Sequence, residues 1–198
     1  LVQRSVSEQF IARFVERMNE TALKLIRGYL KLRGQSPRTK IVTRNFAYHG
    51  VTIATGSLTG LAFAHTDFDL PIARILHTDC PYYYRGAQPG ESEEAFAARL
   101  ADALAQLILR EGPDTVAAFF AEPVMAAGGV IVPPATYFER IQPLLRKYDI
   151  LPEVIGTDPE LTMNTRRGTG YYKVPSLKGV WYRGPFEHNG SVATLEDW

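Results

Sequence analysis

Apolar residues recur at three- and four-residue intervals between Ser7 and Leu32, and Arg, Glu and Lys stand between them. This spacing is typical of an amphipathic helix with one face against a core. Gly34 and Pro37 end the pattern, and the short apolar run over 40–43 then predicts a strand. The apolar positions of the helix are Phe10, Ile11, Phe14, Val15, Met18, Ala22, Leu23, Ile26 and Leu30.

Helix and strand alternate again in the middle of the chain. A second amphipathic pattern begins at Ser92 and stops at the sequence EGPD. The run over 115–121 is apolar on both faces, which suits a strand buried inside a parallel sheet. A third helix is predicted over 134–148, and YDILPEVI begins another short strand. The segment over 51–58 predicts a brief helix, whereas Asp, Pro and Gly residues indicate loops over 61–90.

This order of elements predicts an α/β fold with a mainly parallel sheet, flanking helices and right-handed crossovers. Beyond Leu151 the sequence is rich in Gly, Pro, Arg and aromatic residues and has no helical periodicity. We therefore predict one domain over 1–151 and an irregular tail over 152–198.

The composition excludes several classes of protein. Of the 198 residues, 45% are hydrophobic and 22% are charged, as in an ordinary globular protein. The 22 basic and 21 acidic side chains nearly balance and form no long basic run, which argues against nucleic acid as a partner. No apolar run is long enough to span a bilayer, and the first residues lack the layout of a signal peptide, so we expect no membrane partner.

Cys80 is the only cysteine. The chain therefore has no internal disulfide, no c-type haem attachment and no multi-cysteine metal site. Because a reducing compartment is the simplest setting for such a chain, we expect a cytoplasmic location. Nothing beside Cys80 marks a lowered pKa, so we interpret it as a structural thiol.

Four residues follow predicted strands at the edge where ligands gather in parallel sheets. Tyr48, His49 and Gly50 follow the strand over 40–43, and Glu122 closes the strand over 115–121. A tyrosine ring can stack on a planar heteroaromatic ligand, and glycine lets the backbone approach it closely. Two simpler interpretations stay open. The tyrosine could pack in a core while the histidine caps a helix, and the glutamate could bind a nearby N–H or arginine.

His65 and His77 each precede Thr-Asp, which raises the possibility of a metal site. They lack the i, i+4 spacing that sets two ligands on one helix face, so we predict no metal. Turn chemistry of Asp and Thr in loops explains both motifs.

The motifs as a set resemble the large domain of class III pyridoxal-phosphate (PLP) aminotransferases, the omega-transaminase group. The resemblance runs over 19–151, through NETALKLIRGYLKLRG, KIVTRNFAYHGVTIATGSLTG, HTDCPYYYR and AEPV-x-x-x-GG-x-x-x-PP. It implies part of a type I PLP-transferase large domain, small amine and oxo-acid substrates, and a homodimer. It also implies that Tyr48 stacks on the pyridine ring, with His49 and Gly50 in the same turn and Glu122 in the network below the cofactor. PLP supplies the electron sink in such enzymes.

The sequence departs from the family's pattern at three cofactor anchors. The family's phosphate-binding Gly-Ser-Glu-Ala is replaced by Val15, Glu16, Arg17 and Met18. The Asp that pairs with the pyridine nitrogen has no counterpart over 151–154, and Lys173 and Lys178 do not stand in a family-like context. Catalytic residues are therefore left unassigned, and we expect transamination to be incomplete in this chain.

Two alternative functions remain. The chain could be a non-catalytic binding or assembly module that keeps the transaminase sheet. The segment over 166–198 is similar to the end of di-haem cytochrome c peroxidase-like proteins, which suggests a haem peroxidase-like fragment, although no CxxCH motif is present.

Overall fold

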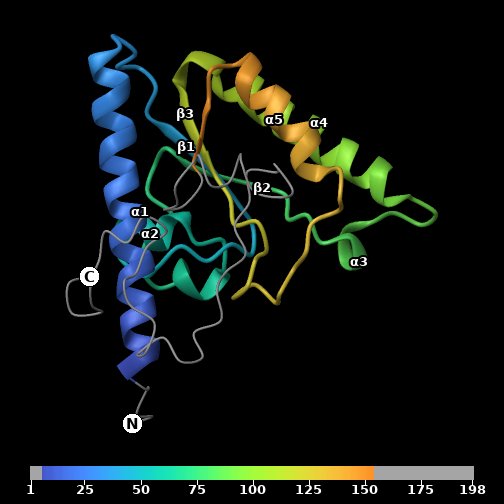
Figure 1. Cartoon of the computed structure of the whole chain (residues 1–198), viewed down its shortest axis with the longest axis horizontal. Coiled ribbons are helices and arrows are strands. Elements are labelled where there is room, and N and C mark those ends of the chain that lie inside the picture. Colours follow the sequence, from blue (N-terminus) through green and yellow to red (C-terminus); the bar gives the residue numbers. More distant parts are fainter. Residues whose placement is uncertain (1–5, 154–198) are drawn as a thin grey trace, which may run out of the picture. The chain divides into compact units, whose positions relative to one another are not determined.

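A four-stranded parallel sheet forms the centre of the fold in the computed structural model, which describes residues 6–153 and the side chains of 16–152 (Figure 1). The strands are β1 (Lys40–Arg44), β2 (Ile75–Thr78), β3 (Val116–Phe120) and β4 (Leu151–Glu153). Their order across the sheet is β2-β1-β3-β4, and every neighbouring pair is parallel. This topology confirms the predicted α/β class.

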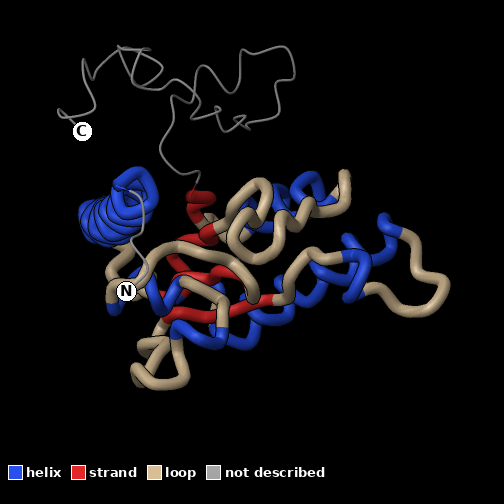
Figure 2. The backbone as a smooth tube through the Cα atoms, turned by 90° about the horizontal axis from the view of Figure 1, so that it is seen from below, coloured by secondary structure: helices blue, strands red, loops and turns tan. Residues whose placement is uncertain are grey.

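Helices cover both faces of the sheet, so that the strands lie between them (Figure 2). The helices are α1 (Val6–Leu32), α2 (Ile53–Leu58), α3 (Tyr83–Gly86), α4 (Glu93–Glu111) and α5 (Tyr137–Lys147). Two short 3-10 turns lie over Ala62–Ala64 and Pro113–Thr115. No helix among these described elements combines the length and apolar character that a membrane span needs.

Alternating strand residues divide the core into two clusters. Val42 and Phe119 point to one face, where they pack against α4 and α5. Ile41 and Phe120 point to the other face, where they pack against α1 and α2. All five residues of β3 are buried, as the apolar run on both its faces predicts.

Local sequence signals set the start of α2 and both ends of α4. Ser92 caps α4 by accepting a hydrogen bond from the N–H of Ala95 at 3.2 Å, and Gly112 ends the helix with φ +87°. Thr52 and Thr55 form a reciprocal capping box at the start of α2. These signals agree with the helices predicted from the sequence.

Two sequence predictions need correction. The interval over 61–90 is not only loop, because it contains β2, a four-residue strand at the edge of the sheet. α5 begins at Tyr137 and not at Pro134, because the N–H of Tyr137 bonds the carbonyl of Pro134 and closes a turn before the helix. The tail predicted over 152–198, with its similarity to peroxidases, lies outside the described residues from 154 onward, so its separate nature stays a prediction.

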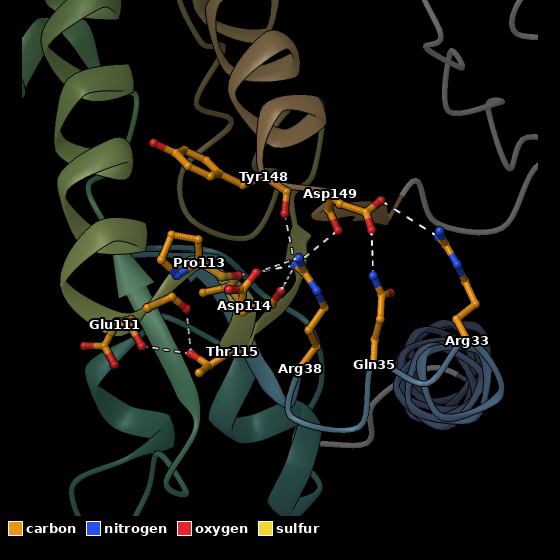
Figure 3. Close-up of polar contacts among 11 residues, drawn as sticks. Arg33, Gln35, Arg38, Glu111, Pro113, Asp114, Thr115, Tyr148 and Asp149 are labelled. Atoms are coloured by element: carbon orange, nitrogen blue, oxygen red, sulfur yellow. Dashed lines mark hydrogen bonds and ion pairs between the residues drawn. The ribbon is translucent and has the colours of Figure 1, made fainter.

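Arg38, in the connection between α1 and β1, joins three segments at the amino edge of the sheet. Its Nη1 lies 2.9 to 3.3 Å from four backbone carbonyl oxygens, those of Pro113, Val116, Tyr148 and Asp149 (Figure 3). The side chain is buried, and its charge is spread over these carbonyl dipoles. The starts of β3 and β4 are therefore fixed from the opposite end to the candidate site.

Candidate functional site

The loops after β1 and β3 meet at the carboxyl edge of the sheet. The backbone N–H of Tyr48 donates to Glu122 Oε1 at 3.0 Å, and the N–H of Ala126 donates to Glu122 Oε2 at 3.3 Å. A small apolar cluster fills the space between these loops and consists of Ala47, Met125 and Ile131. The structure therefore brings Tyr48 and Glu122 together, as their positions after parallel strands predict.

The turn that carries Tyr48 is held by its own backbone. Phe46 has a positive φ of 68°, its N–H donates to the carbonyl of Gly60 at 2.8 Å, and the N–H of Gly60 donates to Ala47 at 2.8 Å. Any Cβ at Gly60 would collide with the backbone of residues 44–46, so only glycine allows this contact. The Tyr48 ring is half-buried on this fixed turn.

His49 lies behind the turn, and its ring is fully buried against Phe120. His49 Nε2 lies 3.1 Å from the Thr43 hydroxyl, which itself donates to the carbonyl of Leu58. Nε2 must therefore carry the proton and donate it. Burial lowers the pKa of His49 from 6.5 to about 3, with a smaller contribution from Arg44. The neutral imidazole is buried between the turn and the sheet, where it contacts Thr43 and Phe120. We propose no ligand contact for this side chain.

Gly50 is needed for the close approach between this turn and α1. It has φ +125°, and a Cβ here would lie 2.5 Å from Glu16 Cγ. Asn19 Nδ2 donates to the carbonyl of His49 at 2.9 Å, and the N–H of Val51 donates to Glu16 Oε1 at 3.1 Å. The glycine of the AYHG sequence thus serves packing on α1.

Glu122 is held mainly by backbone donors. Burial raises the pKa of its carboxyl, while the N–H groups of Tyr48 and Ala126 and the charge of Arg44 oppose that rise. The structure thus agrees with the simpler interpretation of Glu122, in which its carboxylate binds nearby backbone N–H groups. It also makes Glu122 the link between the two loops.

Arg44 ends β1 and was missed by the sequence analysis. Its side chain is fully buried and Nη2 donates to the backbone carbonyl of Glu122. The guanidinium lies 5.8 Å from the Tyr137 ring centroid and 5.7 Å from that of Phe138. Nε and Nη1 have no hydrogen-bond acceptor among the described residues. An arginine at the end of a buried strand is the signal that could have indicated this role.

His65 and His77 come together in space. Their ring centroids are 5.4 Å apart, and His65 Nε2 bonds the carbonyl of Gly56 at 3.1 Å. Burial, and then the neighbouring His65, lower the pKa of His77. Within 6–153 no group of three or more His, Cys, Asp or Glu side chains has an arrangement that could hold a metal ion.

Cys80 lies 3.9 Å from the sulfur of Met125. Burial raises the pKa of its thiol, so the protonated form is favoured. This environment agrees with a structural role.

Comparison with known proteins identifies one family. The family model described as aminotransferase class-III matches residues 16–153. Gamma aminobutyrate transaminase 3 of Solanum lycopersicum, described as chloroplastic, is 55% identical over 133 residues, 67% of this chain and 26% of that protein. A probable gamma-aminobutyrate transaminase 2 of Oryza sativa subsp. indica, described as mitochondrial, is 56% identical over 133 residues, 67% of this chain and 27% of that protein.

Solved structures give the same result. An omega transaminase from Pseudomonas jessenii in complex with PMP has a TM-score of 0.68 and 51% identity, over 69% of this chain and 30% of that chain. A transaminase with L-ala has a TM-score of 0.68 and 58% identity, over 69% of this chain and 32% of that chain. The chain therefore spans about a quarter to a third of the length of the relatives that it matches.

Proposed function

Since the chain belongs to the class III aminotransferase family, we propose that it supplies the ring-binding part of a PLP-dependent aminotransferase. Such an enzyme moves an amino group between an amine or amino acid and an oxo acid. The observation that carries the proposal is the hydrogen bond between the Tyr48 N–H and Glu122, which holds the backbone of an aromatic residue at the edge where β1 and β3 end. PLP, when bound, supplies the electron sink for chemistry at the carbon that bears the amino group.

The described residues fit the ring of PLP. Tyr48 is partly exposed, and the turn that carries it is held by Glu122, Gly60 and the buried His49. The role of Tyr48 is therefore to orient the ligand, and that of Glu122 is to hold Tyr48.

The described residues do not fit the phosphate of PLP. Glu16, Arg17 and Met18 lie inside α1, where each backbone N–H is used by the helix itself. At the start of α2 the N–H groups of Val51 and Thr52 are already bonded to side chains. Since the sequence resemblance assigns the reactive lysine to a segment beyond Leu151, we derive no catalytic step for the described residues.

Partners follow from the same proposal. Because relatives are named for gamma-aminobutyrate, we propose a small amine or amino acid, including ω-amino acids, as amino donor and an oxo acid as acceptor. Exposed apolar side chains at the carboxyl edge support a homodimer; they are Phe46, Val124, Val130 and Val132. A cytoplasmic location stays an expectation from the single cysteine.

Ligand binding to the purified chain tests the ring platform. Pyridoxine 5′-phosphate is a suitable probe, because it has the ring and phosphate of PLP without the aldehyde that reacts with surface lysines. Tyr48→Ala should weaken binding about tenfold or less, because aromatic stacking contributes roughly 0.5 to 1.5 kcal/mol. Tyr48→Phe keeps the aromatic face and is the matched control. Equal dissociation constants for wild type and Tyr48→Ala in equilibrium dialysis would show that Tyr48 only packs in the core.

A second candidate is a non-catalytic binding module, which is favoured because the backbone N–H groups of α1 and of Val51 are already hydrogen-bonded. Transfer from 4-aminobutyrate to an oxo acid separates the two functions. Turnover above that of free PLP supports the enzyme, whereas ring binding without turnover supports the module.

A further inference from the structure

The outer side of α1 carries a second apolar stripe, away from the side that packs against the sheet (Figure 2). Leu25 is 68% exposed, Tyr29 47% and Leu32 91%. Their spacing of four and three residues sets them one above the other on a single helix face. The buried side of the same helix consists of Leu23, Ile26 and Leu30. Adjoining exposed apolar side chains of this size mark a surface that makes a contact.

Positive charge is concentrated beside this stripe. The stripe is bordered by four exposed cations, namely Lys24, Arg27 and Lys31 on one side and Arg33 on the other. The sequence has no Asp or Glu over 21–40, although the whole chain has a net charge of only +1. Among the described residues the only carboxylate within 4 Å of these cations is that of Asp149, at 3.9 Å from Arg33. A partner for this face must therefore be anionic.

Tyr29 is held in place at the border between the apolar stripe and the cations. Arg33 Nη1 donates to the Tyr29 hydroxyl at 3.2 Å, and the guanidinium lies 5.5 Å from the centroid of the ring. A tyrosine with an apolar ring and a hydrogen-bonded hydroxyl suits a boundary between water and an apolar phase. Leu and Tyr flanked by Lys and Arg are the side chains with which helices lie on lipid surfaces.

A lipid surface fits this face better than a protein or a nucleic acid. A stable protein interface buries roughly 1,200 Å² or more, whereas this face is one convex helix with three exposed apolar side chains. A nucleic acid would engage the cations and leave Leu25 and Leu32 in water. An anionic lipid surface engages both kinds of side chain, since its headgroups attract the cations and its boundary region accepts the leucines.

We propose that the outer face of α1 docks on an anionic lipid surface, with Leu25, Tyr29 and Leu32 at the headgroup boundary and the four cations against lipid phosphates. The contact is peripheral. The sequence expectation of no membrane partner rested on the lack of a spanning run, which a surface contact does not need. The proposal goes beyond the proposed transamination and does not depend on it.

Sedimentation of the whole chain with lipid vesicles tests the proposal. The chain should sediment with vesicles of phosphatidylcholine and phosphatidylglycerol in equal parts, and not with vesicles of phosphatidylcholine alone. Lys24→Gln with Lys31→Gln should weaken this binding about twentyfold, because each cation near an anionic surface strengthens binding roughly fivefold. Leu25→Gln with Leu32→Gln should weaken it about tenfold, because two apolar side chains no longer leave water.

A matched control removes two exposed cations from another helix. Arg140→Gln with Arg146→Gln makes the same charge change on α5 and should alter binding by less than about twofold. Equal losses in the α1 and α5 variants would show that net charge alone attracts the chain, and the proposal would be wrong. It would also be wrong if the chain bound neither kind of vesicle, or both equally.

Soluble polyglutamate separates a lipid surface from an acidic macromolecule. If polyglutamate binds as tightly as the anionic vesicles, and only the lysine variant weakens its binding, the face belongs to an acidic macromolecule and the lipid proposal fails. Far-ultraviolet circular dichroism of each variant confirms that α1 is still folded.

Discussion

The carboxylate of Glu122 accepts the backbone N–H of Tyr48 at 3.0 Å, although 74 positions separate the two residues. This bond joins the loop after β1 to the loop after β3. Arg44 adds a further contact between β1 and the loop after β3 by donating to the carbonyl of Glu122. The position of the Tyr48 backbone therefore depends on a contact between two loops, and not on its own turn alone.

Glu122→Ala should lower the free energy of unfolding by about 1 to 2 kcal/mol, because it leaves the N–H groups of Tyr48 and Ala126 without their acceptor. Glu122→Gln should cost much less, since it keeps one acceptor oxygen and removes a carboxyl whose pKa burial already raises. Urea denaturation at pH 7 measures both variants. An equal loss in the two would show that the charge, rather than the acceptor, is what stabilises the junction.

His49 should make the fold sensitive to mild acid. Its pKa is about 3 in the folded chain and near 6.5 when exposed, so the unfolded state takes up a proton first. The free energy of unfolding is not reduced by His49 above pH 6.5. It falls by about 1.4 kcal/mol per pH unit as the pH falls from 6.5 towards 3.

His49→Gln provides the comparison for this pH dependence. Its amide can still donate to Thr43 but does not titrate. The difference in free energy of unfolding between wild type and variant should shrink as the pH falls from 6.5 to 3. A difference that stays constant over this range, measured by urea denaturation, would show that His49 does not cause the acid sensitivity.

Arg38 should contribute far more to stability than its ion pair with Asp114 suggests. The Asp114 side chain is 97% exposed, whereas Arg38 Nη1 reaches four backbone carbonyls (Figure 3). Arg38→Ala should lower the free energy of unfolding by about 2 to 4 kcal/mol, because buried carbonyls lose a charged donor. Asp114→Ala should cost less than about 0.5 kcal/mol, as for most exposed pairs. Similar losses in the two variants would assign the stabilisation to the ion pair.

The carboxylate of Glu91, in the loop before α4, accepts two hydrogen bonds from the guanidinium of Arg99 in that helix, each at 2.8 Å. These bonds join the loop to the helix. The hydrogen bonds from Arg99, and then from the Gln88 N–H, lower the pKa of Glu91 to about 2. The stability that this pair adds is present above pH 4.5 and is lost as the pH falls from 4.5 to about 2.

Glu91→Gln should be less stable than wild type at pH 7 and equal to it near pH 2, with a somewhat smaller difference in 1 M salt, because the Arg99 side chain is 38% exposed and the pair is partly screened. Asp102→Asn, which removes an exposed carboxylate from the middle of α4, is the control. Thermal melts over the pH range measure the effect. A Glu91→Gln difference that is independent of pH and salt would argue against an ionic contribution.

Periodicity alone determined the main elements of this fold. The helical spacing before Leu32 and after Ser92 predicts α1 and α4, and the apolar run over 115–121 predicts the buried strand β3. These predictions succeed because each element must bury an apolar face or run that is visible within one segment. β2 was missed because it is a four-residue edge strand with only half-buried middle positions, so it has no such run.

The candidate site was predictable only in part. The positions of Tyr48 and Glu122 after parallel strands placed them at one edge, because all strands of a parallel sheet end on the same side. The buried side chain of His49, the central place of Arg44 and the contact of Glu16 with Val51 were not predictable, since each depends on atoms brought together from distant segments. The sequence by itself thus determined the elements and the edge on which a ligand surface forms. The tertiary structure decided which side chains support that surface, because hydrogen bonds and burial exist only after the segments have packed.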